Sequence, residues 1–465
     1  MRNQFPGYYR LLDEELGALW RGCTFALDAS VLLNLYRYPE AAREELFTVF
    51  EHVKDRLWIP HHAALEFQRN RPRVVAEQMR RFNDVRGVLE TGMNDLRLEM
   101  GKLQLERRHS SIDPAPLFDQ MKDSVQRFLR QLDRLKEQQP DIQDRDPIRD
   151  RIDVLLDDRV GKPFDSQEIL DQIYERGENR YARRTPPGYK DATKDGGGEP
   201  SEFEYGGSIF RRRFGDLIIW EQMIAHAEAQ QIKKLVFLTD DEKEDWWWIV
   251  RSLGDRKLGP RPELVAEILL RGGVEGFHLY TSESFLELSS AYLDVAVREE
   301  SISQVQDVRR IASRRMAARR RAATEATGAV ALWLKDTMSG ADVSLDRSGD
   351  EIADIVVSFE GESWSEVIGY QVLYLRDGRA VSPRLQDRLG RAFYEISQGR
   401  YERFGFVLAV EDEEHVAKLI ELVDDRWEVP PGVFVIVGVL ERGDGPFPDF
   451  VHRYEASSDD DHMES

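Results

Sequence analysis

Short apolar runs alternate with amphipathic stretches in residues 20–68 and 214–295. The run FALDASVLLNLY is typical of a buried strand that turns into a helix, and KKLVFLTDD predicts a second buried strand. Helical spacing follows in EAAREELFTVFEHV, and RLWIP predicts a short strand that Pro60 closes. A further strand and helix are expected in GFHLYTSESFLELSSAYL. Strands that alternate with helices predict a parallel α/β sheet.

The segment between these two halves has a different pattern. Residues 70–160 are charged and helical with a thin apolar stripe, so we expect a helical insertion that projects from the core as an antiparallel hairpin. Residues 161–213 are rich in Gly, Pro and basic side chains, which predicts a largely irregular basic loop. The run FGDLIIWEQMIAHAEAQ then predicts an amphipathic helix.

Residues 298–465 predict a connector, a second domain and a tail. The connector, residues 298–328, is expected to be an arginine-rich helix, because RRIASRRMAARRR holds seven arginines and no acidic residue. Residues 329–455 predict a smaller α/β domain that begins with an apolar helix (AVALWLK), and residues 456–465 predict a disordered tail.

The order of elements in the second domain loosely resembles the restriction-endonuclease-like core. Asp354 takes the first acidic position of that core. Gly369 and Gln371 stand where an acidic residue and a lysine are needed. We therefore expect binding or sensing from this domain, not catalysis.

Composition limits the classes of protein that fit. With 465 residues and 41% apolar residues the chain is folded and has more than one domain. The single cysteine excludes an internal disulfide framework and a thiolate zinc site, and it fits a reducing compartment. We see no signal peptide and no apolar run of about 18 residues, so a cytoplasmic protein that binds no membrane is expected. The net charge of −21 argues against nonspecific coating of nucleic acid, but not against a nucleic-acid enzyme.

Acidic residues lie at the ends of several buried segments. They are Asp28, Glu66, Asp216, Asp240 and Asp241. A carboxylate at the end of a strand is costly unless it is hydrogen-bonded, paired or bound to a cation. Several of them from distant parts of one chain predict a shared Mg²⁺ or Mn²⁺ site, since these ions prefer oxygen ligands. For Asp28 or Asp216 alone, a helix N-cap is the open alternative.

Basic and aromatic residues near these carboxylates predict a substrate-binding surface. They are Arg180, Tyr181, Lys190, Lys194, Arg213 and Lys243. Arginine and lysine contact phosphates, and tyrosine stacks on bases. A solvated loop and a surface lysine are the open alternatives. The arginine run of the connector either binds a nucleic-acid backbone or pairs with acidic residues.

Five segments occur in a fixed order over residues 20–295: FALDASVLLNLYRY, RLWIPHHAALEFQRNR, RYARRTPPGYKD, FGDLIIWEQMI and VFLTDDEKEDWWW. They resemble the bacterial PIN-like domain family, whose members are metal-dependent nucleases with a Rossmann-like parallel sheet. The resemblance implies a PIN-like domain over residues 1–297, in which water is the nucleophile. It places the acidic residues of the family's site, in chain order, on Asp28, Glu66, Asp216 and Asp241, with Asp240 assisting.

These observations predict a metal-dependent nuclease that hydrolyses phosphodiester bonds of RNA or of single-stranded or branched DNA. Similar PIN-like proteins suggest a role in defence against phage. The alternatives are a noncatalytic nucleic-acid or protein interaction module that keeps a PIN-like shell, and a phosphatase or nucleotide hydrolase with the same metals. The second domain is the place where we expect a second copy or a protein partner to bind.

Overall fold

Two units, each with its own central sheet, make up the structure, which is a computed structural model. They comprise Met1–Tyr189 with Gly215–Val308, and Lys190–Phe214 with Arg309–Ser465. The structure describes residues 1–103, 113–140, 146–192, 201–251, 255–345, 352–360, 365–375, 382–442, 445 and 447–457. Among these residues, no helix combines the length and the apolar character that a membrane crossing needs.

A four-stranded sheet in the order β2-β1-β5-β8 forms the centre of the first unit. Its strands are β1 (Thr24–Leu27), β2 (Leu57–Trp58), β5 (Lys234–Leu238) and β8 (Gly276–Tyr280). Every neighbouring pair is parallel, and the register pairs Phe25 with both Leu57 and Val236. β1 and β5 are buried because apolar residues fill almost all of their positions. The expected parallel α/β sheet is confirmed.

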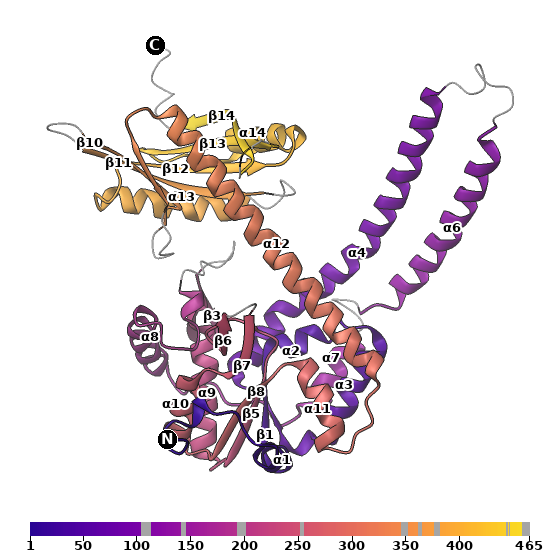
Figure 1. Ribbon diagram of the computed structural model, residues 1–465, viewed down its shortest axis with the longest axis vertical. Helices are drawn as coiled ribbons and strands as arrows, with labels where there is room; N and C mark the ends of the chain where they lie inside the picture. The colour runs from indigo at the N-terminus through magenta and orange to yellow at the C-terminus, as the bar shows by residue number, and fades with distance from the viewer. Residues whose placement is uncertain are drawn as a thin grey trace. The chain divides into compact units, whose positions relative to one another are not determined.

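Helices pack on both sides of this sheet, with α9 and α10 on one side and α3 and α11 on the other (Figure 1). The helices of this layer are α1 (Asp13–Gly22), α2 (Ala29–Asn34), α3 (Glu40–His52), α9 (Gly215–Ala229), α10 (Pro262–Arg271) and α11 (Ser282–Tyr292). The hairpin of β6 (Trp247–Arg251) and β7 (Asp255–Pro260) follows β5. Short 3₁₀ helices are η1 (Pro6–Tyr8), η2 (Lys54–Arg56), η3 (Tyr189–Asp191) and η4 (Arg212–Phe214).

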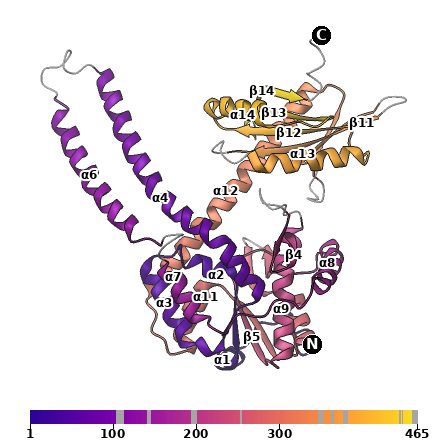
Figure 2. The ribbon, with the colours of Figure 1, turned by 180° about the vertical axis from the view of Figure 1, so that it is seen from behind.

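The expected helical insertion is present as two long helices that extend away from the sheet (Figures 1 and 2). They are α4 (His61–Lys102) and α6 (Ala115–Glu137). Arg86 pairs with Asp133 across the two helices at 2.5 Å. The next helix, α7 (Pro147–Leu155), does not belong to this arm, because its residues Ile148 and Ile152 are buried in the core.

The prediction of a largely irregular segment over residues 161–213 is wrong. Residues Gln167–Ala182 form helix α8, whose buried side chains include Leu170, Ile173 and Tyr174. These apolar residues recur at helical spacing, and the polar composition around them hid that pattern. Strands β3 (Glu202–Tyr205) and β4 (Ser208–Arg211) form a further hairpin, which belongs to the second unit.

The main sheet of the second unit has six strands in the order β14-β13-β12-β11-β10-β9. They are β9 (Asp342–Leu345), β10 (Ile355–Glu360), β11 (Ser365–Tyr374), β12 (Arg403–Val410), β13 (Val433–Glu441) and β14 (Asp449–Ser457). β11, β12 and β13 are parallel to one another. The pairs β9–β10, β10–β11 and β13–β14 are antiparallel. Helices α13 (Ser382–Ser397) and α14 (Glu413–Arg426) pack on one face through Leu389 and Leu419. The expected second α/β domain is therefore present.

The other face of this sheet is covered by the end of α12 (Glu299–Thr337), through Ala329, Val330 and Leu334. The expected connector and the expected apolar helix AVALWLK are thus parts of one continuous helix. Strands β9 and β14 were not predicted. Because β14 continues to Ser457, the first two residues of the expected disordered tail are strand, and residues 458–465 lie outside the described residues.

Asp354 and Gln371 of the second unit both hold its strands. Asp354 accepts a hydrogen bond from the Val372 amide at 2.8 Å. Gln371 donates to the Ile352 carbonyl oxygen and accepts from Arg388, both at 2.9 Å. Gln371, which stands where catalysis needs a lysine, is therefore engaged in hydrogen bonds within the domain.

Four histidines of the first unit, namely His61, His62, His226 and His278, have pKa values that burial depresses. Burial lowers the pKa of His278, on β8, to about 4, and the charge of Arg10 acts in the same direction. Burial also lowers the pKa of His226 to about 4, and its ring stacks on Trp58 at 3.9 Å between centroids. Both imidazoles are therefore neutral in the folded protein at neutral pH.

This burial predicts a loss of stability on mild acidification. Between about pH 6.5 and pH 4 these histidines are protonated in the unfolded chain but stay neutral in the folded protein. The free energy of unfolding therefore falls as the pH is lowered through this range. For His278 the fall is on the order of 3 kcal/mol. Urea unfolding followed by tryptophan fluorescence at pH 7.5, 5.5 and 4.5 measures it. His278→Gln should lessen the fall and His52→Gln, on the exposed side of α3, should not; equal pH dependence in wild type and His278→Gln would contradict the prediction.

Candidate metal centre

The carboxyl ends of β1, β5 and β8 meet at one edge of the sheet, and each is followed by polar residues. The ladder continues past the strands, because Asp28 N donates to Leu238 O at 2.9 Å and Thr239 N donates to Tyr280 O at 3.0 Å. This register brings Asp28 beside the residues that follow β5. Ligands bind at this edge in open parallel sheets.

Asp28 is a half-buried carboxylate that two hydroxyl groups hold. Ser30 Oγ and Thr239 Oγ1 donate to its Oδ2 at 2.5 and 2.8 Å. Burial raises the pKa of Asp28, the Ser30 and Thr239 hydrogen bonds oppose this, and the charge of Asp241 raises it further. Asp28 occupies the N-cap position of α2, but its side chain makes no capping hydrogen bond. Geometry therefore disfavours the capping alternative for this residue.

Asp240 is an anchor between elements. Its carboxylate accepts hydrogen bonds from Asn34 Nδ2 at 2.7 Å, Tyr38 Oη at 3.0 Å, and Ser282 N and Oγ, both at 2.8 Å. These donors come from α2, the segment after it and α11. Because four hydrogen bonds already use its oxygens, the role that geometry supports for Asp240 is to join the loops after β1, β5 and β8.

Asp241 and Asp216 are joined by the ammonium group of Lys243. Lys243 Nζ lies 2.9 Å from Asp241 Oδ2 and 3.6 Å from Asp216 Oδ2. Asp216 is in the first turn of α9, where the positive end of the helix dipole favours a carboxylate. Asp241 also stabilises the turn of its own loop, since its Oδ1 accepts a hydrogen bond from the Lys243 amide at 3.0 Å. A cation of the chain itself therefore lies between two of the predicted ligands.

Glu66 reaches the same region from α4. A Cβ built on Gly215 would lie 2.6 Å from Glu66 Oε1, so a side chain at this position would displace the carboxylate from its present place. His62, one turn before Glu66, has its Nε2 at 3.6 Å from Glu66 Oε1. Burial lowers the pKa of His62 to about 3, so the imidazole is neutral there. Its backbone amide is fixed by Gln222 of α9 at 2.9 Å.

The donors of this region are oxygen atoms, which suit Mg²⁺ or Mn²⁺. Within the described residues, no group of three or more His, Cys, Asp or Glu side chains is gathered closely enough to hold a metal ion. Of the predicted ligands, Asp216 and Asp241 both approach the Lys243 ammonium, so a positive charge fits between these two carboxylates. The residues therefore fit a divalent ion in the chemistry of their oxygen donors.

The predicted substrate-binding residues are found in different settings. Arg180 pairs with Glu267 at 2.7 Å, and Tyr181 is only 7% exposed, so both are engaged inside the first unit. The expected contact of these two with a substrate is therefore not what their surroundings favour. Lys190 and Arg213 fall in the segment that groups with the second unit, and their role stays a prediction. Lys194 lies outside the described residues.

The tryptophans that follow Asp241 stabilise its loop. Trp246 and Trp247 are buried. Trp247 Nε1 donates to the carbonyl oxygen of Asp241 at 2.7 Å. Trp248 is half-buried and meets Tyr8 edge to face. The indole hydrogen bond fixes the backbone from which the Asp241 side chain extends.

A family model described as a PIN-like domain matches residues 24–264, more than half of the chain. The chain belongs to the PIN-like domain family. The PIN-like domain is a nuclease-type fold that acts on nucleic acid, and PIN domains usually use divalent metals. No curated protein and no solved structure matches the chain.

Sequence reasoning missed the hydroxyl residues of this PIN-like domain. Ser30, Thr239 and Ser282 each follow a strand end directly or within three residues, and each donates to Asp28 or Asp240. Their position just after buried strands was the available signal, as in LDAS, LTDD and YTSES. Ser30 and Asp28 are only two residues apart. The other two pairings were not visible, because Ser282 lies 42 residues from Asp240 and Thr239 lies 211 residues from Asp28.

The hydroxyl shell predicts a stability effect. Thr239→Val keeps the shape of the side chain but removes one of the two hydroxyl donors to the Asp28 carboxylate. We expect a loss of about 1–3 kcal/mol in the free energy of unfolding, because a charged acceptor loses a hydrogen bond without gaining water. Urea denaturation at pH 7.5 measures it. The matched control is Thr48→Val on α3, whose exposed hydroxyl bonds only the Glu44 carbonyl; equal losses in the two variants would refute the assignment.

Proposed function

We propose that this protein is a metal-dependent nuclease that hydrolyses phosphodiester bonds at the carboxyl edge of β1 and β5. The observation that carries the proposal is the approach of Asp216 and Asp241 to one ammonium group, with Asp28 close enough for the charge of Asp241 to raise its pKa. Acidic side chains gathered on one edge repel one another, and a bound divalent cation is one way to offset that repulsion.

Asp28, Glu66, Asp216 and Asp241 are the proposed ligands of Mg²⁺ or Mn²⁺. When bound, such an ion supplies positive charge to the phosphate and acidifies a water molecule for attack. Asp28 is oriented by Ser30 and Thr239, and Glu66 has room because residue 215 is glycine. Lys243 contributes a second positive charge beside the phosphate. Asp240 holds the loops together in this proposal and does not bind the ion.

RNA and single-stranded or branched DNA remain the proposed substrates, and a role in defence against phage remains part of the proposal. The positively charged residues Lys190, Lys194 and Arg213 are proposed to contact the substrate backbone. A noncatalytic nucleic-acid or protein interaction module is the second candidate. The Asp240 anchor favours it in one respect, since one acidic residue of the set has a purely structural setting.

Substitution of the proposed ligands tests the activity. Asp28→Asn and Asp241→Asn each remove a negative charge that the proposed ion needs, so we expect a loss of about 100-fold or more in kcat. Labelled RNA, single-stranded DNA and flap DNA are incubated with Mn²⁺ or with EDTA, and the products are separated by length. Free phosphate released from nucleotides without strand cleavage would favour the phosphatase class.

The control for this assay is Asp55→Asn, because the Asp55 side chain is 98% exposed on the first unit. It should cut like wild type. Wild type that cuts none of the three substrates with Mn²⁺, or ligand variants that cut as well as wild type, would end the catalytic proposal in favour of the interaction module.

Lys243 gives a test that needs no substrate. Lys243→Gln leaves Asp216 and Asp241 without the ammonium between them, so in EDTA we expect a lower Tm than in wild type. Mn²⁺ should then raise the Tm of Lys243→Gln more than that of wild type, because the ion takes the place of the ammonium. Differential scanning fluorimetry measures both.

The matched control is Lys257→Gln, since Lys257 pairs with Glu242 and lies over the Trp247 ring near the same loop. It should respond to Mn²⁺ like wild type. If Mn²⁺ shifts the Tm of neither wild type nor Lys243→Gln, the proposed metal centre is wrong.

A further inference from the structure

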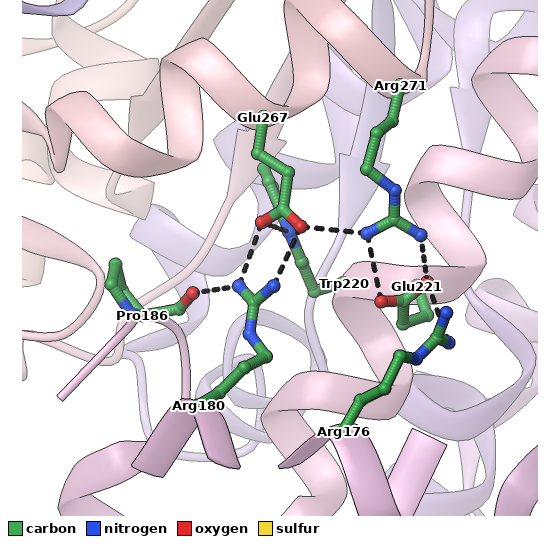
Figure 3. A network of polar contacts seen from close by, with 7 residues as sticks. All are labelled: Arg176, Arg180, Pro186, Trp220, Glu221, Glu267 and Arg271. Carbon is green, nitrogen blue, oxygen red and sulfur yellow. Dashed lines mark hydrogen bonds and ion pairs between the residues drawn. The ribbon is translucent and has the colours of Figure 1, made fainter. Parts of the chain in front are cut away.

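A half-buried network of ion pairs joins α8 to α9 and α10 (Figure 3). Arg180 donates to both carboxylate oxygens of Glu267, at 2.7 and 2.8 Å. Trp220 Nε1 donates to Glu267 Oε2 at 2.8 Å. The side chains of Arg180 and Glu267 are 17% and 18% exposed. Two parallel hydrogen bonds fix the plane of the guanidinium as well as its position.

The network continues outward from Glu267. Arg271 donates to Glu267 at 2.8 Å and to Glu221 at 2.5 and 3.0 Å. Arg176 lies on α8 one turn before Arg180, 3.7 Å from Glu221, and its side chain is 55% exposed. Arg176 and Arg180 are thus the same residue type on the same helix and in the same network. Of the two, Arg180 also bonds the turn that follows α8, through the carbonyl oxygen of Pro186.

Arg180 holds the turn that follows α8 from two sides. Its backbone carbonyl accepts from Arg183 N at 3.2 Å and from Thr185 N at 2.8 Å. Its guanidinium donates to the carbonyl oxygen of Pro186, as Figure 3 also shows. The turn passes through Arg184 at φ 53°, a left-handed conformation that a side chain disfavours. A turn with such a residue needs support from its surroundings.

The same turn ends on the two acidic loops of the candidate metal centre. Gly188 N donates to Asp245 Oδ2 at 3.0 Å, and Asp245 is fully buried in the loop that carries Asp241 and Lys243. A Cβ built on Gly188 would lie 3.3 Å from the Cβ of Asp216. Gly188 therefore lies close to Asp216 on α9, and its amide is bonded to Asp245 of the loop after β5.

We propose that Arg180 is a positioning residue for the candidate metal centre. Its guanidinium is fixed by Glu267 of α10, and it holds the turn 183–188 against Asp216 and Asp245. It thereby sets the spacing between the first turn of α9 and the loop after β5, the two segments that carry Asp216 and Asp241. The inference rests on the proposed function in that this spacing matters for catalysis.

Loss of Arg180 has different effects if its ion pair is purely structural and if Arg180 is a positioning residue. A structural pair contributes to global stability, and its loss changes hydrogen exchange throughout the core. A positioning residue affects the turn and the two loops, and it lowers kcat while KM for the nucleic acid is kept, because misplaced ligands act on the transition state. A buried ion pair often adds little to global stability. A local effect without a global one therefore distinguishes the positioning role from the structural role.

Arg180→Lys tests the proposal, because lysine keeps the charge but lacks the fork that bonds Glu267 and Pro186 together. Hydrogen–deuterium exchange is measured by mass spectrometry on the full chain, in wild type, Arg180→Lys and the control Arg176→Lys. We expect about fivefold faster exchange or more in peptides that cover 183–188 and 241–246, and wild-type exchange in β1 and β5. On a substrate that wild type cuts, kcat should fall about 10-fold or more with KM within about twofold.

Four results decide the matter. Wild-type exchange and kcat in Arg180→Lys overturn the positioning role, and so does an equal effect of Arg176→Lys. Faster exchange spread over β1 and β5 with a lower Tm also overturns it, in favour of a purely structural pair. If wild type cuts no substrate, the proposed function fails, while local exchange confined to the turn and the 241–246 loop still supports Arg180 as the residue that holds them.

Discussion

The parallel pairing of β1 with β5 is the constraint on which the candidate metal centre depends. It places the carboxyl ends of two strands, from residues more than 200 positions apart, at one edge of the sheet. The amide of Asp28 continues the ladder by donating to Leu238, and the amide of Thr239 continues it towards β8. Because the backbone hydrogen bonds fix these positions, the side chains of Asp28, Thr239 and Asp240 meet there in one arrangement.

Charge is the second constraint, because carboxylates this close together repel one another. The structure offsets the repulsion in three ways: hydroxyl donors to Asp28, four donors to Asp240, and an ammonium between Asp216 and Asp241. The raised pKa of Asp28 shows that burial and the charge of Asp241 together outweigh its hydroxyl donors. A divalent cation is the further offset that we propose, and this links the fold of the PIN-like domain to the proposed chemistry.

The network of ion pairs between α8, α9 and α10 lies next to the elements that carry the candidate metal centre. Arg180 had the features of a phosphate ligand in the sequence, since it lies in a basic segment with tyrosines, glycine and prolines. In the structure its guanidinium is bonded to Glu267, a residue 87 positions away on α10. The sequence pattern did not indicate this partner. An arginine that faces a buried carboxylate and one that faces a phosphate look alike until the helix opposite is known.

The amino-acid sequence by itself determined the parallel sheet, the long helical insertion, the second α/β domain and the carboxylates that lie at strand ends. Apolar periodicity and the cost of a charge beside a buried strand are local properties, so they are visible in short windows. It did not determine α8, where a few apolar residues at helical spacing are hidden among charges. Only the tertiary structure decided that Asp240 is an anchor, that Lys243 joins Asp216 to Asp241, and that Gly215 leaves room for Glu66. Except for the short Lys243–Asp241 pair, each of these depends on a side chain from a distant element, and the sheet alone sets which distant elements meet.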